Sequence, residues 1–282
     1  MTGSRDALRG VCEEARRKDL TVGFVPTMGF LHSGHLSLAR RTREECDFAV
    51  MSIFVNPLQF GPNDDLASYP HHLGRDSGLA EEAGMDLLFT PDEAEMYPHG
   101  RPEVTVDPGP LGDRLEGASR PGHFRGVCTV VAKLFTLVGP CRAYFGEKDA
   151  QQLAVIRRMA GDLDMPVDVI GCPTVREPDG LAMSSRNVYL SEDERAAALS
   201  LSRALFEAVE LAAAGERDAG ALRARMVARV EAEPLATLDY VAVVDDRTFE
   251  DVDRLLGPTR ALIAARVGRA RLIDNALLSG ED

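Results

Sequence analysis

Residues 20–35, LTVGFVPTMGFLHSGH, determine the fold class of this chain. The first six form a largely apolar run that ends at Pro26, which predicts a buried strand. Residues 34–46 then place Leu36, Leu38 and Ala39 at the start of a helical pattern. A strand, a short glycine-containing turn and a helix together form the first half of a βαβ unit.

The same alternation continues along the chain to about residue 172. Further strands are predicted at residues 48–55, 85–90, 104–106, 142–145 and 167–171, and further helices at 5–18, 73–83, 124–138 and 149–163. Alternating strands and helices are typical of a parallel sheet that helices cover on both faces. The sequence therefore predicts an α/β fold with a Rossmann-like, doubly wound parallel sheet.

The pattern changes after the segment 173–180. Helices are predicted at residues 192–214 and 218–233, followed by strands at 238–244, 261–267 and 271–278. Ser191 and Glu194 form a capping-box pattern at the start of the first of these helices. We expect two domains: a Rossmann-like domain over residues 1–174 and a smaller α+β C-terminal domain over residues 175–282.

Composition narrows the class of protein. The formal net charge of −13 argues against a broad nucleic-acid-binding face. No run approaches the roughly 20 apolar residues of a membrane span, and the charged N-terminal segment does not resemble a secretory signal. The five cysteines are scattered without a CxxC pair, as expected for buried, reduced thiols. We therefore expect a cytoplasmic protein with no membrane or nucleic-acid partner.

Two histidines lie in the turn between the first strand and its helix. His32 and His35 are one helical turn apart and so point the same way. The helix N-terminus offers free N–H groups and partial positive charge, and Gly29 and Gly34 let the backbone approach a ligand closely. The segment 26–35 therefore predicts an ATP phosphate site in which the histidines stabilise charge on the α-phosphate.

Other interpretations of the histidine pair stay open. His-x-x-His spacing supplies half of a zinc site, although the sequence has no HExxH and no cysteine partner for it. The pair can also be buried without a role. The sequence has neither a GxxxxGK[ST] motif nor GxGxxG after this strand, so the site is not a P-loop or a standard dinucleotide fingerprint.

A second candidate segment, residues 146–149 (GEKD), also joins a predicted strand to a helix. Lys148 is one of only three lysines in a chain with 29 arginines, and a point cation here suits a phosphate. The alternative is a solvated lysine in a loop.

A third segment, residues 183–187 (MSSRN), combines hydroxyls, backbone N–H groups and one arginine, which suit a pyrophosphate leaving group. The alternative is a serine-rich cap before a helix. Since the helix is predicted to start at Ser191, we expect a mobile loop that closes over the site.

Polar residues also follow the second strand and begin a later helix. Gln59 is expected at the carboxyl end of a strand, where it would hold a hydroxyl or a carboxylate, and Gln152 follows Lys148 on the next helix. Arg120 and His123 are further candidates, with an exposed turn as the alternative.

Taken together, these segments carry a resemblance. HSGH resembles the HxGH signature of the nucleotidyltransferase superfamily, and MSSR resembles its KMSKS-type loop. The ordered set VPTMGFLHSGH, FVNPLQF, FGEKDAQQ and TVREPDGLAMSSRNVYL resembles more narrowly the pantothenate synthetase (pantoate–β-alanine ligase) family, over about residues 20–190.

The resemblance implies an ATP-dependent ligase. ATP and (R)-pantoate would form pantoyl-adenylate and pyrophosphate, and the amine of β-alanine would then displace AMP to give pantothenate. The resemblance also implies Mg²⁺ beside ATP and a homodimer.

The resemblance also assigns residues. The ATP site would comprise Met28, Gly29, Phe30, Leu31, His32, Ser33, Gly34, His35, Gly146, Glu147, Lys148, Asp149, Val175, Met183, Ser184, Ser185 and Arg186. The catalytic residues among them would be His32, His35, Lys148, Ser184, Ser185 and Arg186, with His35 as the proton donor. Gln59 would bind pantoate and β-alanine, Gln152 would bind pantoate, and Asp76 would lie near Mg²⁺.

One position departs from the family pattern. His71 and His72 follow Pro70, where the family often has arginine, so no role is assigned there. Two other functions stay open: an HxGH nucleotidyltransferase with another acid or a phosphate acceptor, and a nucleotide-binding regulator without catalysis.

Overall fold

The computed structural model describes residues 1–61, 64, 66 and 69–279. The chain divides into two compact units. The first comprises residues 1–147 and 151–173, and the second comprises residues 148–150 and 174–282. The expected division of the chain into a domain of residues 1–174 and a domain of residues 175–282 stays a prediction.

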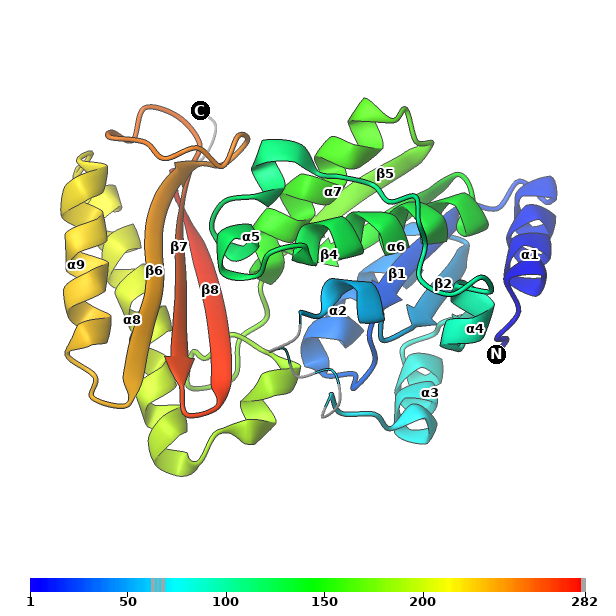
Figure 1. Cartoon of the computed structure of the whole chain (residues 1–282), viewed down its shortest axis with the longest axis horizontal. Helices are drawn as coiled ribbons and strands as arrows, with labels where there is room; N and C mark the ends of the chain where they lie inside the picture. The colour runs from blue at the N-terminus through cyan, green and yellow to red at the C-terminus, as the bar shows by residue number, and fades with distance from the viewer. Residues whose placement is uncertain (62–63, 65, 67–68, 280–282) are drawn as a thin grey trace. The chain divides into compact units, whose positions relative to one another are not determined.

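A parallel sheet of five strands forms the centre of the first unit (Figure 1). Its strands are β1 (Val22–Thr27), β2 (Phe48–Ile53), β3 (Leu87–Phe89), β4 (Cys141–Gly146) and β5 (Val167–Cys172), in the order β3-β2-β1-β4-β5. The chain runs outward from β1 to β3, then returns to β4 beside β1. This reversal is a topological switch point, and ligands of open α/β sheets bind at the carboxyl ends of the strands there.

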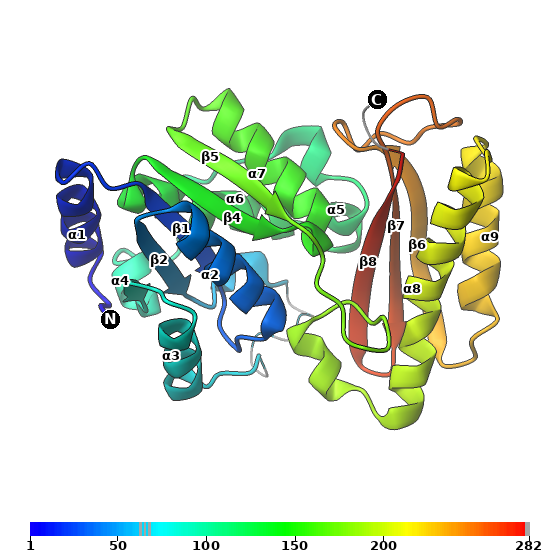
Figure 2. The same ribbon diagram turned by 180° about the vertical axis from the view of Figure 1, so that it is seen from behind.

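Helices cover both faces of this sheet. Figure 1 shows α6 in front of the strands, and Figure 2 shows α2 in front of them from the opposite side. The helices of the first unit are α1 (Arg5–Arg17), α2 (Ser33–Glu45), α3 (Leu73–Glu82), α6 (His123–Val138) and α7 (Ala150–Asp162), with the short α4 (Glu93–Met96) and α5 (Glu116–Ser119). The expected doubly wound α/β fold is confirmed.

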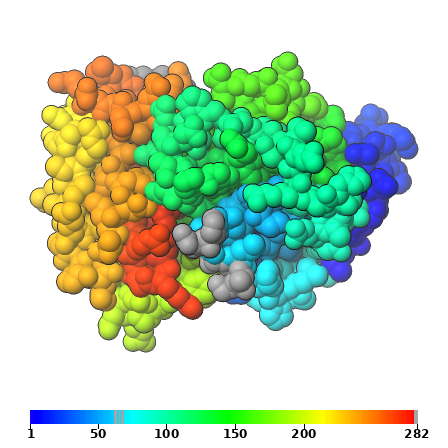
Figure 3. Space-filling model, in the orientation of Figure 1, coloured from blue at the N-terminus to red at the C-terminus, as the bar shows by residue number. Residues whose placement is uncertain are grey.

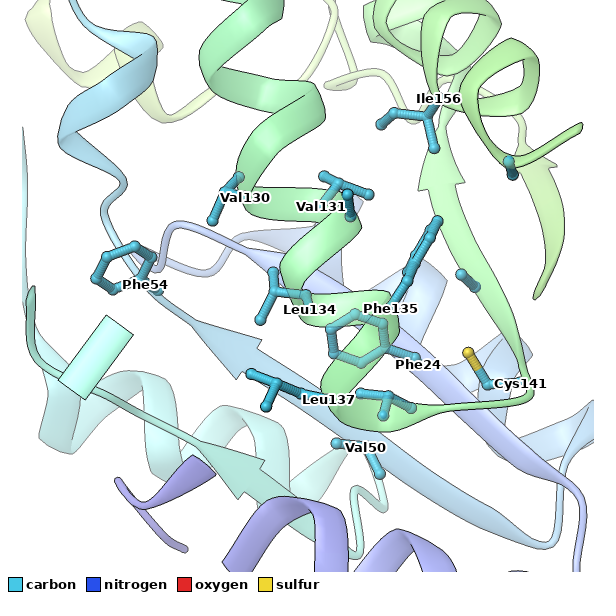
Figure 4. Packing of buried hydrophobic residues seen from close by; sticks show 14 of the residues in the cluster. Phe24, Val50, Phe54, Val130, Val131, Leu134, Phe135, Leu137, Cys141 and Ile156 are labelled. Carbon is cyan, nitrogen blue, oxygen red and sulfur yellow. The ribbon is translucent and has the colours of Figure 1, made fainter. Parts of the chain in front are cut away.

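Alternate strand residues pack against opposite layers of helices. Phe24 of β1 belongs to one buried cluster with Leu134 and Phe135 of α6 (Figure 4). Val25, the next residue, belongs instead to a cluster with Leu38 of α2. Burial of a side chain of this size stabilises the fold by about 1.5–3 kcal/mol, so both helical layers hold the sheet.

The prediction of a strand at residues 104–106 is wrong. These residues lie in the described part of the chain and form no strand there. Val104 is 87% exposed, and the backbone N–H of Val106 donates to Thr129 Oγ1 of α6 at 3.0 Å. The segment between α4 and α6 therefore runs over the surface, where it forms much of the visible face of the first unit (Figure 3).

The second unit is an α+β module. Its elements are α8 (Glu192–Ala213), α9 (Ala219–Glu231), β6 (Ala236–Asp245), β7 (Thr259–Val267) and β8 (Ala270–Ser279), and the strands form an antiparallel sheet in the order β6-β7-β8. Ile263 of β7 shares a buried cluster with Leu205 of α8 and Met226 of α9. The predicted capping box is present, because Ser191 and Glu194 each accept the other's backbone N–H.

All five cysteines are buried and free, as expected. Within the described residues, no helix has the length and apolar character needed to cross a membrane.

Candidate functional site

The turn after β1 adopts a conformation that requires glycine. Gly29 has φ +86°, and a Cβ there would lie 2.9 Å from Ile53 Cγ2. Thr27 Oγ1 accepts the N–H of Gly29 at 3.2 Å and donates to Ser52 O at 2.8 Å. The turn is therefore fixed to β2 before the chain reaches the histidines.

Asp76 of α3 holds the same turn from the other side. Its carboxylate, 1% exposed, accepts the backbone N–H of Phe30 at 2.6 Å and that of Leu31 at 2.8 Å. Phe30 itself has φ +50°, a strained value for a residue with a side chain. Two charge-assisted hydrogen bonds thus offset strain in the backbone that leads into α2.

His32 and His35 lie together at the N-terminus of α2. Their rings stack with centroids 4.0 Å apart and planes 28° apart. His32 is the N-cap residue but its side chain makes no capping hydrogen bond, and the first turn of α2 contains no acidic residue. Two imidazoles beside the positive end of a helix, with Ser33 and Gly34 between them, suit a phosphate.

Gln59 lies in a 3-10 turn, η1 (Pro57–Gln59), just after β2. It is 8% exposed, and its Nε2 lies 3.1 Å from Met28 Sδ in the turn after β1. Its backbone oxygen accepts from Arg120 Nη2 at 3.3 Å and lies 2.8 Å from His123 Nδ1. Arg120 and His123 thus hold Gln59, so the alternative of a merely exposed turn is wrong for them.

Asp64 extends this contact. Its carboxylate pairs with Arg120 Nη2 at 2.9 Å and accepts the N–H of Gly61 at 2.9 Å. Burial alone would raise the pKa of Asp64, but the hydrogen bonds from Arg120 and Gly61 together lower it. Asp64 therefore stays ionised and keeps Arg120 in place over Gln59.

Lys148 and Asp149 belong to the second unit and lie in the 3-10 turn η4 (Glu147–Asp149). Lys148 Nζ lies 3.6 Å from Asp149 Oδ1, and the Lys148 backbone oxygen accepts from Asn275 Nδ2 of β8 at 2.9 Å. Asn275 Oδ1 in turn accepts from Arg260 of β7 at 2.5 Å. The two strands thus fix the backbone of Lys148.

Hydrogen bonds within the second unit hold the segment 175–187 in place. Met183 N–H donates to Val175 O at 2.9 Å, and Asn187 Nδ2 donates to Glu177 Oε1 at 2.7 Å. Ser184 caps the 3-10 helix η5 (Ser185–Tyr189), since its side chain accepts the N–H of Arg186. The capping interpretation thus holds for Ser184, and the expected loop motion stays a prediction.

Comparison with known proteins identifies the family to which the chain belongs. The family profile described as Pantoate-beta-alanine ligase matches residues 1–277. A pantothenate synthetase of Heliobacterium modesticaldum is 60% identical over 265 residues, 94% of each chain, and one of Pelotomaculum thermopropionicum is 55% identical over 96% of each. The chain belongs to the pantoate–β-alanine ligase family.

Solved structures agree with this family assignment. A pantothenate synthetase from Thermus thermophilus superposes with a TM-score of 0.92 at 50% identity, over 98% of each chain. A pantoate-beta-alanine ligase from Francisella tularensis, complexed with beta-gamma ATP and beta-alanine, has a TM-score of 0.80 at 34% identity, over 98% of this chain and 97% of that one. The resemblance inferred from the motifs is confirmed.

Two neighbouring glutamines, Gln151 and Gln152, differ in burial. Gln151 is 2% exposed: its Oε1 accepts the N–H of Glu116, and its Nε2 donates to Leu111 O and Arg114 O. Gln151 therefore supports the loop before α6, whereas Gln152 is half-buried, and its role in binding pantoate stays a prediction. Neighbouring glutamines have no distinguishing signal in the sequence; only their burial separates them.

Proposed function

We propose that this chain joins pantoate to β-alanine at the expense of ATP, through a pantoyl-adenylate. The observation that carries the proposal is the match to the pantoate–β-alanine ligase family over residues 1–277, with a relative at 60% identity. In the first step, a pantoate carboxylate oxygen attacks the α-phosphorus and pyrophosphate leaves. In the second, the β-alanine amine attacks the acyl carbon, loses a proton and releases AMP.

The histidines act on the first step. Attack on a phosphorus atom needs in-line positioning and neutralised charge more than covalent help. The stacked His32 and His35 lie where the N–H groups of α2 begin, so together they hold phosphate oxygens. His35 gives a proton to the developing charge. Loss of one such contact costs about 3–4 kcal/mol of transition-state stabilisation, as for an oxyanion donor.

The other ATP residues act by binding. Met28 to Leu31 and Ser33 to Gly34 line ATP through the turn, and Gly146, Glu147, Asp149 and Val175 complete its binding site. Lys148 neutralises phosphate charge, and Met183, Ser184, Ser185 and Arg186 bind the pyrophosphate that leaves. Gln59 binds pantoate and β-alanine, and Gln152 binds pantoate.

Mg²⁺ would enter with the phosphates of ATP and neutralise their charge. The described residues include no cluster of three His, Cys, Asp or Glu side chains that holds a metal. Asp76 accepts backbone N–H groups with both of its oxygens, so it suits a positioning role better than direct metal ligation. Phosphates and water supply most Mg²⁺ ligands in sites of this kind, which is consistent with the residues present.

We also propose that the protein is a cytoplasmic homodimer, as the family resemblance implies. Its substrates are the small molecules pantoate, β-alanine and ATP, and neither a membrane nor a nucleic acid is involved. Sedimentation equilibrium tests the dimer: a mass of one chain at micromolar concentration would contradict it.

The test of the reaction is product formation from all three substrates. We expect AMP and pantothenate to accumulate over many turnovers only when pantoate, β-alanine and ATP are all present, and no AMP release with other small hydroxy acids in place of pantoate. Equal or faster turnover with another acid would contradict the proposal. Lys148→Ala should be nearly inactive, while the matched control Lys18→Ala, an exposed lysine beside α1 that pairs with Glu14, should keep full activity.

A further inference from the structure

The side chain of Gln59 lies at the end of a chain of hydrogen bonds that begins at Tyr97, the C-cap residue of α4. Tyr97 Oη donates to Asn56 Oδ1 at 2.7 Å, and Asn56 Nδ2 donates to Gln59 Oε1 at 3.2 Å. All three side chains are buried, Asn56 completely. Neither Tyr97 nor Asn56 takes part in the steps described above.

Two backbone groups fix the orientation of the Asn56 amide. The N–H of Leu58 is only a donor, and it points at Oδ1 from 3.3 Å. The carbonyl of Gly126 is only an acceptor, and it lies 3.1 Å from Nδ2. A flipped amide would set donor against donor and acceptor against acceptor, so Asn56 has one orientation.

This orientation determines what Tyr97 and Gln59 must do. Because Asn56 offers Tyr97 an acceptor, the phenol has to donate. Burial raises the pKa of Tyr97, and the charge of Glu93 raises it further, so the phenol keeps that proton. The second N–H of the Asn56 amide donates to Gln59 Oε1. The Nε2 group of Gln59 is thereby turned toward Met28 Sδ, a weak acceptor.

The main chain of Gln59 is held as well, by Arg120 and His123. Rotation of the side-chain amide is then the freedom that remains to this residue, and the bond to Asn56 removes it. A binding group whose partners fix it in advance loses less entropy when the ligand arrives.

We propose that Tyr97 is a positioning residue that acts through Asn56 to present Gln59 to the substrate as a hydrogen-bond donor. The inference rests on the proposed function, in which Gln59 binds pantoate and β-alanine. A donor binds the hydroxyl or carboxylate oxygens of pantoate and the carboxylate of β-alanine, and it does not bind the β-alanine ammonium group. The amine that attacks the acyl-adenylate is therefore not held by Gln59.

The first test is Tyr97→Phe, which keeps the ring and removes the hydroxyl. In pantoate-dependent pyrophosphate–ATP exchange, we expect the KM for pantoate to rise about tenfold, because the variant loses one hydrogen bond that orders Gln59. The KM for ATP and the rate at saturating pantoate should stay within about twofold, because the hydroxyl acts on substrate binding. The matched control is Tyr144→Phe: Tyr144 is also buried in the first unit, but its hydroxyl donates to Glu45. That variant should leave both KM values unchanged.

The second test separates positioning from general loosening of the fold. If Tyr97 acts through Gln59, then adding Tyr97→Phe to Gln59→Ala should not raise the KM for pantoate further. Gln59→Glu keeps an oxygen for Asn56 but presents a carboxylate to the substrate, so the KM for pantoate should rise at least as much as in Gln59→Ala.

Each outcome bears on one of the two proposals. A full additional rise in KM in the double variant, or near-normal pantoate binding by Gln59→Glu, would overturn the role of Tyr97. Wild-type protein that shows no exchange with pantoate would instead overturn the proposed function, and the substrate assigned to Gln59 with it.

Discussion

Asp76 connects two elements through the backbone of the nucleotide turn. Its carboxylate lies between α3 and the residues that precede His32, and it accepts two main-chain N–H groups. The histidine pair can be recognised in the sequence, whereas this support cannot, because 46 residues separate Asp76 from Phe30. The family resemblance implied that Asp76 lies near a metal. The geometry shows that its carboxylate holds the backbone of the turn.

Replacing Asp76 with asparagine tests this task. The amide side chain would keep one acceptor and lose the charge, so one backbone N–H would lack its partner. We expect the free energy of unfolding to fall by about 1.5–3 kcal/mol, the range for hydrogen bonds to charged groups. The KM for ATP should rise as well, because the turn carries the histidines.

Urea unfolding and exchange kinetics measure these two effects. The control is Asp6→Asn, an exposed carboxylate in the first turn of α1 that should cost less than about 1 kcal/mol. If Asp76→Asn were as stable and as active as this control, the positioning role of Asp76 would be ruled out.

Among the elements, α6 and the η1 turn approach each other closely. A Cβ on Gly126 would lie 2.2 Å from Leu58 O and 2.6 Å from Gln59 N. Both are backbone atoms, so the overlap cannot be relieved by rotating a side chain. The missing side chain of Gly126 lets α6 support the turn that carries Gln59.

We expect Gly126→Ala to displace this turn. The strain should lower the free energy of unfolding by about 1–3 kcal/mol, as for other overpacked sites. It should also raise the KM for pantoate, since Asn56 donates to the Gly126 carbonyl.

The control lies on a neighbouring helix. A Cβ on Gly161 of α7 would meet nothing within 4 Å, so Gly161→Ala should stabilise the protein by about 0.5–1 kcal/mol. Thermal unfolding compares the two variants, and an unchanged or higher Tm for Gly126→Ala would refute the close-approach argument.

Elements with a strong local pattern were predictable from the sequence. The apolar run before Pro26 and the capping box at Ser191 both led to elements close to those observed. The strand expected at 104–106 failed because alternating valines can also lie in a surface segment, where Val104 is exposed and Val106 bonds to Thr129. Local pattern does not reveal which segment has a strand beside it to pair with.

The candidate site was predictable only in part, for a similar reason. His32, His35 and Gln59 lie within eight residues of a strand's carboxyl end, and the topology brings such positions to one edge of the sheet. Asn56 and Tyr97 were missed as a pair because their contact spans 41 residues. Long-range hydrogen bonds leave no periodic signal in a single sequence.

The buried thiols make the free energy of unfolding of the protein depend on pH. Burial raises the pKa of Cys12 from 9.0 to about 11, and those of Cys128 and Cys141 from 9.0 to about 12. Above pH 9 the unfolded chain loses these protons while the folded chain keeps them. Because the folded pKa values are raised, this stabilisation is complete below pH 9 and is lost as the pH rises toward 11–12.

We therefore expect the free energy of unfolding to fall between pH 9 and pH 11, by up to about 1.4 kcal/mol per pH unit for each thiol. Urea unfolding at several pH values measures the slope. Cys128→Ala should show a shallower slope than the wild type, whatever its stability at neutral pH. Identical slopes would mean that Cys128 does not contribute.

Exchange of labelled pyrophosphate into ATP reports the adenylation of pantoate without any later step. We expect exchange that requires pantoate and proceeds without β-alanine, because the acyl-adenylate forms and reverses before the amine is needed. No exchange in the presence of pantoate, or exchange only after β-alanine is added, would contradict it.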